Sequence, residues 1–182
     1  MRKIVLSYLL VLCSLVAVAQ TPVRVACIGN SITYGAGIEN RERDAYPVQL
    51  QRMLGEGYVV GNFGKSGATL LNKGHRPYIE QKEFQRALTF AGDVVVIHLG
   101  INDTDPRDWP NYRDYFVRDY LALIDSFRVV NPKVRILVAR MTPITNRHSR
   151  FESGTRDWHE QIQQAIERVA ELAGAQLIDF HA

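Results

Sequence analysis

Short runs of β-branched residues alternate with longer segments of helical periodicity from residue 23 to the end of the chain. Such alternation predicts βαβ units, and therefore a parallel sheet with helices on both faces. Each run is brief and mostly apolar, as buried parallel strands are. The five expected strands are residues 23–28, 58–62, 93–99, 134–139 and 176–178. The expected fold class is α/β, a three-layer α/β/α sandwich with a five-stranded parallel sheet.

Four segments between these runs repeat apolar residues at the spacing of an amphipathic helix. In the last of them Ile162, Ile166 and Val169 fall on one face, and Gly174 follows where a C-cap glycine belongs. The expected helices are residues 45–54, 79–90, 112–130 and 155–173. Ligands of such sheets bind at the carboxyl ends of the strands. The loops there are residues 29–37, 63–69, 100–105 and 141–149.

The first 19 residues have the form of a secretory signal peptide. Arg2 and Lys3 precede an apolar run that ends in small residues before Gln20. The run is about 15 residues long, short of the roughly 20 that a membrane span needs. We expect cleavage after Ala19, which makes residues 20–182 one secreted or periplasmic domain without a stable membrane span. An uncleaved anchor is the alternative.

Net charge and cysteine content limit the partners and the disulfides that the protein can have. Loss of Arg2 and Lys3 lowers the formal net charge of +3 by two, so nothing favours a nucleic-acid partner. Cys13 is lost with the signal peptide, which leaves Cys27 without an internal disulfide partner.

Three loop residues could perform acyl-transfer chemistry. Ser31 follows the first strand on a tight turn into a helix. Its hydroxyl there would be an exposed nucleophile. The alternative is that the serine simply caps the helix. Gly64 could bring a backbone N–H close to a developing oxyanion, or be an ordinary turn residue. The Asn102 side chain could donate to the same oxyanion, or form an Asx turn.

Together these residues resemble the SGNH hydrolase superfamily, the GDSL-type esterases and lipases. The family's ordered blocks supply a serine, a glycine, an asparagine within Gly-x-Asn-Asp and a histidine within Asp-x-x-His. Ser31, Gly64 and Asn102 occupy the first three positions in that order, although Asn30 stands where many members carry Asp. The resemblance covers residues 23–182. It implies a flavodoxin-like fold, an acyl-Ser31 intermediate, and an oxyanion held by the N–H groups of Ser31 and Gly64 and by the Asn102 side chain.

The fourth block is missing, because none of the five histidines has an Asp three residues before it. We expect the chain to be truncated at its C-terminus before the catalytic Asp and His, and to hydrolyse little alone, since the serine lacks its base. Further C-terminal domains are expected in the natural protein. His148 is the alternative base. His98 is expected to be a satisfied core histidine, and His159 to lie on a helix surface.

Four residues near these loops are candidate substrate contacts: Asp103, His148, Arg76 and Arg140. Guanidinium groups bind carboxylates bidentately, although a solvated charged surface is the alternative for the arginines. Residues 45–50, 64–71 and 98–107 resemble secreted bacterial sialate O-acetylesterases.

The expected function is the removal of O-acetyl groups from a carbohydrate such as sialic acid. No metal or organic cofactor is expected, because the sequence offers no convincing His/Cys/Asp ligand set. The alternatives are a lipid acyl-ester hydrolase or thioesterase of the same fold, and an inactive glycan-binding module.

Overall fold

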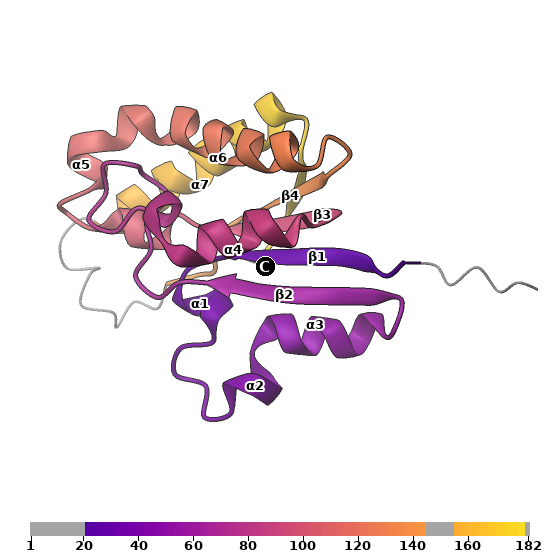
Figure 1. Ribbon diagram of the computed structural model, residues 1–182. Helices are drawn as coiled ribbons and strands as arrows, with labels where there is room; N and C mark the ends of the chain where they lie inside the picture. The colour runs from indigo at the N-terminus through magenta and orange to yellow at the C-terminus, as the bar shows by residue number, and fades with distance from the viewer. Residues whose placement is uncertain (1–20, 145–154, 181–182) are drawn as a thin grey trace, which may run out of the picture.

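Five parallel strands form one sheet in the order β2-β1-β3-β4-β5 (Figure 1). The computed structural model describes residues 21–144 and 155–180. The strands are β1 (Val23–Gly29), β2 (Tyr58–Gly64), β3 (Val94–His98), β4 (Arg135–Ala139) and β5 (Gln176–Ile178). The α/β class and the five-stranded parallel sheet are confirmed, and each expected strand agrees with the observed one to within two residues.

The two helical layers are unequal. One face of the sheet carries α4 (Lys82–Phe90), α6 (Phe116–Val130) and α7 (Thr155–Ala173). The other face carries α3 (Tyr46–Leu54), with the short α1 (Ser31–Tyr34) and α2 (Arg41–Asp44) beside it (Figure 1). Short turns complete the described chain: η1 (Tyr78–Glu80), η2 (Ile101–Thr104), α5 (Trp109–Tyr112) and η3 (Arg113–Tyr115).

The larger part of the hydrophobic core lies under α4, α6 and α7. Ile97 of β3, Tyr120 of α6 and Ile166 of α7 are all fully buried there. Side chains alternate between the two faces of each strand. Cys27 of β1 and Val96 of β3 therefore point to the α3 face, where both are buried. On that face the ring of Phe180 lies 5.9 Å from Tyr46 and 5.1 Å from His98, measured between centroids.

Two expected helices are shorter than their periodicity suggests. The segment 79–90 is interrupted at Gln81, whose extended backbone separates η1 from α4. The segment 112–130 begins on the last residue of α5, passes through the η3 turn and becomes α-helical again at Phe116. Helix α1 confirms the expected turn into a helix at Ser31. Helix α2 was not expected, because four residues are too few to display a helical period.

No helix within the described ranges is long and apolar enough to cross a membrane. The expected signal peptide, residues 1–19, lies outside those ranges, and so does His148.

Candidate active site

Asn30 shapes the turn that carries Ser31. It is fully buried, its Oδ1 accepts the Ile32 N–H at 2.9 Å, and its Nδ2 donates to the carbonyl oxygen of His98 at 3.4 Å. The first contact caps α1 and the second ties that turn to the end of β3. Ser31 is the first residue of α1 and is half-buried. Among the hydrogen bonds of the described residues, none uses the Ser31 hydroxyl or N–H.

The second loop packs directly on α1. A Cβ atom added to Gly64 would lie 2.1 Å from the backbone nitrogen of Tyr34, so only glycine permits this approach. Asn62 Nδ2 donates to the carbonyl oxygen of Thr33 at 2.8 Å. The Lys65 N–H donates to the carbonyl oxygen of Gly29 at 2.9 Å, which holds the loop beside the end of β1.

The structure does not support Gly64 as an oxyanion donor, because its N–H already donates to Asn62 Oδ1 at 2.9 Å. The N–H groups of Ser66 and Gly67 take no part in the hydrogen bonds of the described chain. Gly67 has a φ of +78°, the left-handed region that favours glycine. Gly67 therefore replaces Gly64 as the candidate donor. The sequence did contain a sign of the hydrogen bond from Gly64 to Asn62, since an Asn side chain often accepts the N–H two residues ahead.

Asn102 connects the third loop to the second. It lies in η2, is 9% exposed, and its Nδ2 donates to the carbonyl oxygen of Ala68 at 2.9 Å. An amide nitrogen carries two hydrogens, so the second can point to an oxyanion. The bond to Ala68 places this side chain next to Gly67 in the second loop.

Asp103 anchors the second loop and is not a substrate contact. It is fully buried, and its two carboxylate oxygens accept the N–H groups of Leu70 and Leu71 at 2.9 and 2.8 Å. Burial raises its pKa to about 7. The expectation of an Asp103 contact with substrate is therefore wrong, because none of its surface is open to a ligand.

Arg76 and Arg140 have different environments. Arg76 Nη1 donates to the carbonyl oxygen of Ser66 at 3.0 Å, and its side chain lies against Gly67. Arg140 forms ion pairs with Glu167 at 3.2 Å and with Asp179 at 3.1 Å. These pairs join the end of β4 to α7 and to the segment after β5. The structure thus shows Arg140 in structural ion pairs, and the expected substrate contacts of Arg140 and Arg76 both stay predictions.

None of the three histidines that the structure describes is hydrogen-bonded to Ser31. His98 is fully buried, but neither ring nitrogen has a hydrogen-bond partner in the described chain, so the expectation of a satisfied histidine is wrong. Burial lowers its pKa to about 4. His159 is 7% exposed with Nε2 at 3.2 Å from the carbonyl oxygen of Thr142, so its expected place on a helix surface is also wrong.

One cluster was not expected from the sequence. The ligand atoms of His75, Asp105 and Asp108 lie within 4.8 Å of one another. His75 Nδ1 lies 2.6 Å from Asp108 Oδ2, and Arg107 binds both oxygens of Asp105 at 2.8 and 2.9 Å. The Arg107 guanidinium holds the pKa of Asp105 well below its usual range. Because these groups already bind one another and Arg107, we regard the cluster as an ion-pair network.

Residues 27–182 match the model of the GDSL-like lipase/acylhydrolase family. An acetylxylan esterase of Xylanibacter ruminicola is 37% identical over 188 residues, which cover 93% of this chain but only 38% of that protein. This chain therefore spans less than half the length of that relative.

Solved structures share the fold at low identity. A carbohydrate acetylesterase from Sinorhizobium meliloti superposes with a TM-score of 0.63 at 18% identity, covering 86% of this chain and 83% of that one. The aryl esterase of M. smegmatis gives a TM-score of 0.61 at 18% identity, with the same coverage of 86% and 83%. At such identities the likeness establishes the fold alone.

Proposed function

Because the chain belongs to the GDSL-like lipase/acylhydrolase family, we propose that it is a serine esterase that removes acetyl groups from a carbohydrate. The observation that carries this proposal is the joining of the three loops at the carboxyl ends of β1, β2 and β3. Asn30, Asn62 and Asn102 each use a side-chain amide to fasten one loop to another element. Ser31, Gly67 and Asn102 then supply a hydroxyl and three N–H groups from neighbouring loops.

The reaction proceeds through an acyl-serine. Ser31 Oγ attacks the ester carbonyl carbon and gives its proton to a base, and the carbonyl oxygen becomes an oxyanion. The N–H groups of Ser31 and Gly67 and the Asn102 amide donate to that oxygen. Collapse expels the sugar oxygen, which takes up a proton, and water then hydrolyses the acetyl-serine to acetate. The base is not among the described histidines, and the family resemblance assigns it to an Asp-x-x-His block.

The polarity of the cavities beside α1 supports a carbohydrate over a lipid acyl chain. Two cavities beside α1 are lined mainly by charged and polar side chains. The relative from Xylanibacter ruminicola is an acetylxylan esterase, which supports an acetylated polysaccharide as the natural substrate class. Sialic acid is one carboxylated sugar within the proposed class, but neither that relative nor the two solved structures are named for it.

We also propose export and a longer natural protein. The Arg2-Lys3 pair and the apolar run after it support export through a signal peptide removed after Ala19. The limited share of the relative that the chain spans supports additional domains.

The test is acetate release from an acetylated xylo-oligosaccharide by the protein expressed from its complete native coding region. Ser31→Ala should reduce the rate by at least about 10³-fold, because the nucleophile is lost. Ser126→Ala is the matched control, since Ser126 lies on α6 and bonds only the Ala122 carbonyl oxygen. An equal rate in the Ser31→Ala variant would exclude the acyl-serine mechanism.

A further inference from the structure

A cavity with an unusual charge lies beside the candidate active site. Its volume is about 460 Å³. The side chains around it come from α1, from the second loop and its continuation, and from the start of α4. They are Tyr34, Lys65, Ser66, Arg76, Lys82, Glu83 and Arg86. We call it the cationic cavity, because four of these residues are basic and one is acidic.

Most of the positive charge in the cationic cavity is not neutralised. Within the described chain, Lys82 and Arg86 form no ion pair or hydrogen bond, and Arg76 binds only the carbonyl oxygen of Ser66. Lys65 faces Glu83, with 3.6 Å between Nζ and Oε1. Three cations thus remain available to a bound anion, and the walls of a cavity strengthen their combined field.

Glu83 provides a second, independent indication of a ligand. It is 9% exposed, and its Oε2 has no hydrogen-bond partner in the described chain. Leaving a buried carboxylate oxygen unpaired costs free energy, about 1–3 kcal/mol or more for a charged group. Because Oε2 itself is buried, a ligand with a hydroxyl group would satisfy it once the Glu83 side chain turns toward the cavity that it lines. A simple inorganic anion such as sulfate would not, because it carries no hydrogen to donate.

The cationic cavity is close to Ser31. Tyr34 lies three residues after Ser31 in α1, so the two side chains share a face of the helix, with Cβ atoms about 5–6 Å apart. Ser66, which also lines the cavity, directly precedes Gly67. A sugar bound with its ester at Ser31 can therefore place a neighbouring group in the cavity.

We propose that the cationic cavity binds the carboxylate of an acidic sugar unit, so that the substrate is an acetylated glycan that carries a uronic acid or a similar carboxylated sugar. Arg76, Lys82 and Arg86 bind the carboxylate, and Glu83 Oε2 accepts a hydroxyl hydrogen from the same unit. This assignment of substrate class rests on the proposed esterase function.

The test measures binding apart from catalysis. The Ser31→Ala chain is titrated by calorimetry with a xylo-oligosaccharide carrying one glucuronic acid, and with the unsubstituted oligosaccharide of the same length. We expect the acidic ligand to bind about tenfold or more tightly, and 0.5 M salt to remove most of that preference, since salt screens exposed charges at a few ångströms.

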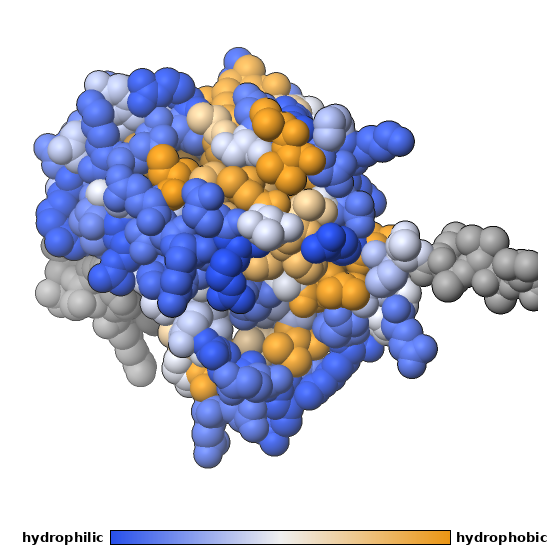
Figure 2. Space-filling model, viewed as in Figure 1, coloured by the Kyte–Doolittle hydropathy of each residue, from blue (hydrophilic) through white to orange (hydrophobic). Residues whose placement is uncertain are grey.

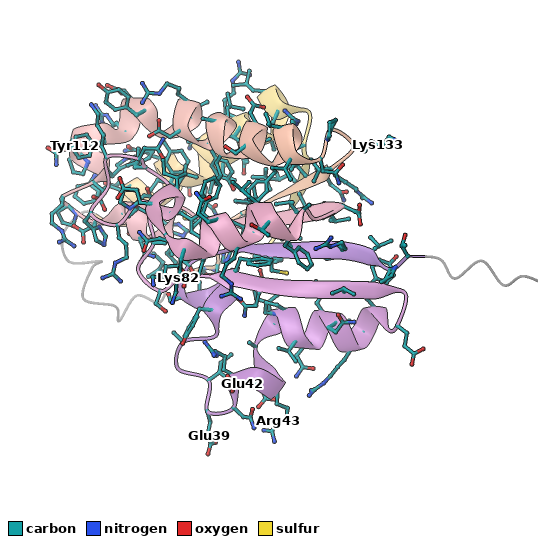
Figure 3. All side chains as sticks on the ribbon, in the orientation of Figure 1. Glu39, Glu42, Arg43, Lys82, Tyr112 and Lys133 are labelled. Carbon is teal, nitrogen blue, oxygen red and sulfur yellow. The ribbon has the colours of Figure 1, made fainter. Side chains whose placement is uncertain are left out.

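Substitutions at the cavity and away from it complete the experiment. Lys82→Gln combined with Arg86→Gln should abolish the preference for the acidic ligand. Lys133→Gln is the matched control, because Lys133 is exposed at the opposite end of the molecule from Lys82 (Figure 3). Lys82, Arg86 and Lys133 are exposed, and Figure 2 shows mainly hydrophilic residues around the start of α4, so these three substitutions leave the core untouched.

Glu83→Gln should instead tighten binding of the acidic ligand a few-fold, since it removes the one negative charge and keeps an acceptor oxygen.

Equal affinity for the two ligands, or a preference that survives in the double variant, would overturn the proposal. Acetate release with no acidic preference would reject the cavity assignment alone. A clear acidic preference without any acetate release by the wild type would reject the esterase function and leave an acidic-glycan binding site.

Discussion

At the scale of single residues, two buried ionisable groups near the site respond to pH in opposite directions. Burial lowers the pKa of His98 to about 4 and raises that of Asp103 to about 7. In both cases the folded protein prefers the neutral form, because the charged form would lose its hydration. Their contributions to the free energy of unfolding partly cancel between pH 4 and 7, so each must be measured through a variant.

His98 should make the wild type less stable in acid. The unfolded chain binds a proton at this residue below a pKa of roughly 6.5, whereas the folded chain does not until about pH 4. Stability is therefore lost as the pH falls through this window, by roughly 3 kcal/mol in total. In His98→Leu this loss should be absent when urea unfolding is followed at pH 4.5, 5.5 and 7. An unchanged pH dependence in the variant would contradict the assignment.

Asp103 should have the opposite effect. Between roughly pH 4 and about 7 the folded chain keeps a proton that the unfolded chain has lost, so stability decreases as the pH rises. Asp103→Asn cannot titrate, and it also loses one of the two acceptors for Leu70 and Leu71. The stability advantage of the wild type over Asp103→Asn should therefore shrink from pH 4 to pH 7 in denaturant titrations. A constant difference across that range would show that Asp103 is charged throughout.

We expect Asn102 to stabilise the transition state and not the bound substrate. Asn102→Ala should lower kcat for acetate release by about 10²- to 10³-fold with little change in KM, because the oxyanion forms only during the reaction. The control is Asn111→Ala, whose amide donates to backbone oxygens on the surface. A rise in KM with kcat unchanged would assign Asn102 to substrate binding.

The sequence predicted some of these residues and not others. Ser31 and Asn102 follow strands at predictable points, and the structure brings their loops together as the order of the blocks implies. The sequence predicted Gly64 and not Gly67 as the donor, because the sequence alone does not say which glycine N–H is already bonded. The environment of Asp103 was missed for a related reason, since its partners Leu70 and Leu71 are more than thirty residues away.

At the scale of elements, the junction between β2 and α1 depends on the absence of a side chain. Gly64→Ala would place a Cβ atom 2.1 Å from the Tyr34 nitrogen, so the backbone of α1 must shift. We expect the free energy of unfolding to fall by about 1–3 kcal/mol. Gly57→Ala, just before β2, meets no atom within 4 Å and should change stability by less than about 0.5 kcal/mol. Thermal and urea unfolding of both variants test this, and equal stabilities would contradict the close packing.

Strands were easier to predict than helix ends. An apolar run bounded by turn residues fixes a strand to within a residue or two, even for β2 and β5, which are only partly buried. Helix ends depend on local backbone geometry that periodicity does not report. The extended Gln81 lies inside a segment of continuous helical period and still divides η1 from α4.

At the scale of the whole molecule, alternation along the sequence predicted the layered fold, but it did not predict the cationic cavity. That cavity combines Tyr34, Lys65 and Arg86, which lie on three separate elements. They come together because α1 and α4 both pack against β2, and Lys65 directly follows that strand (Figure 1). The spacing of residues along the chain does not indicate which side chains come together around this cavity.

The order of the strands also determines when the site can form as the chain is synthesised. Strand β1 comes first in the sequence, yet it pairs with both β2 and β3. The pairing of β1 with β3 is complete only when residue 98 has been made. The hydrogen bond from Asn30 Nδ2 to the His98 carbonyl oxygen also becomes possible only then. Such distant pairings close slowly. A nascent chain therefore carries Ser31 on an unformed turn until residue 98 has been made, which suits the export proposed above.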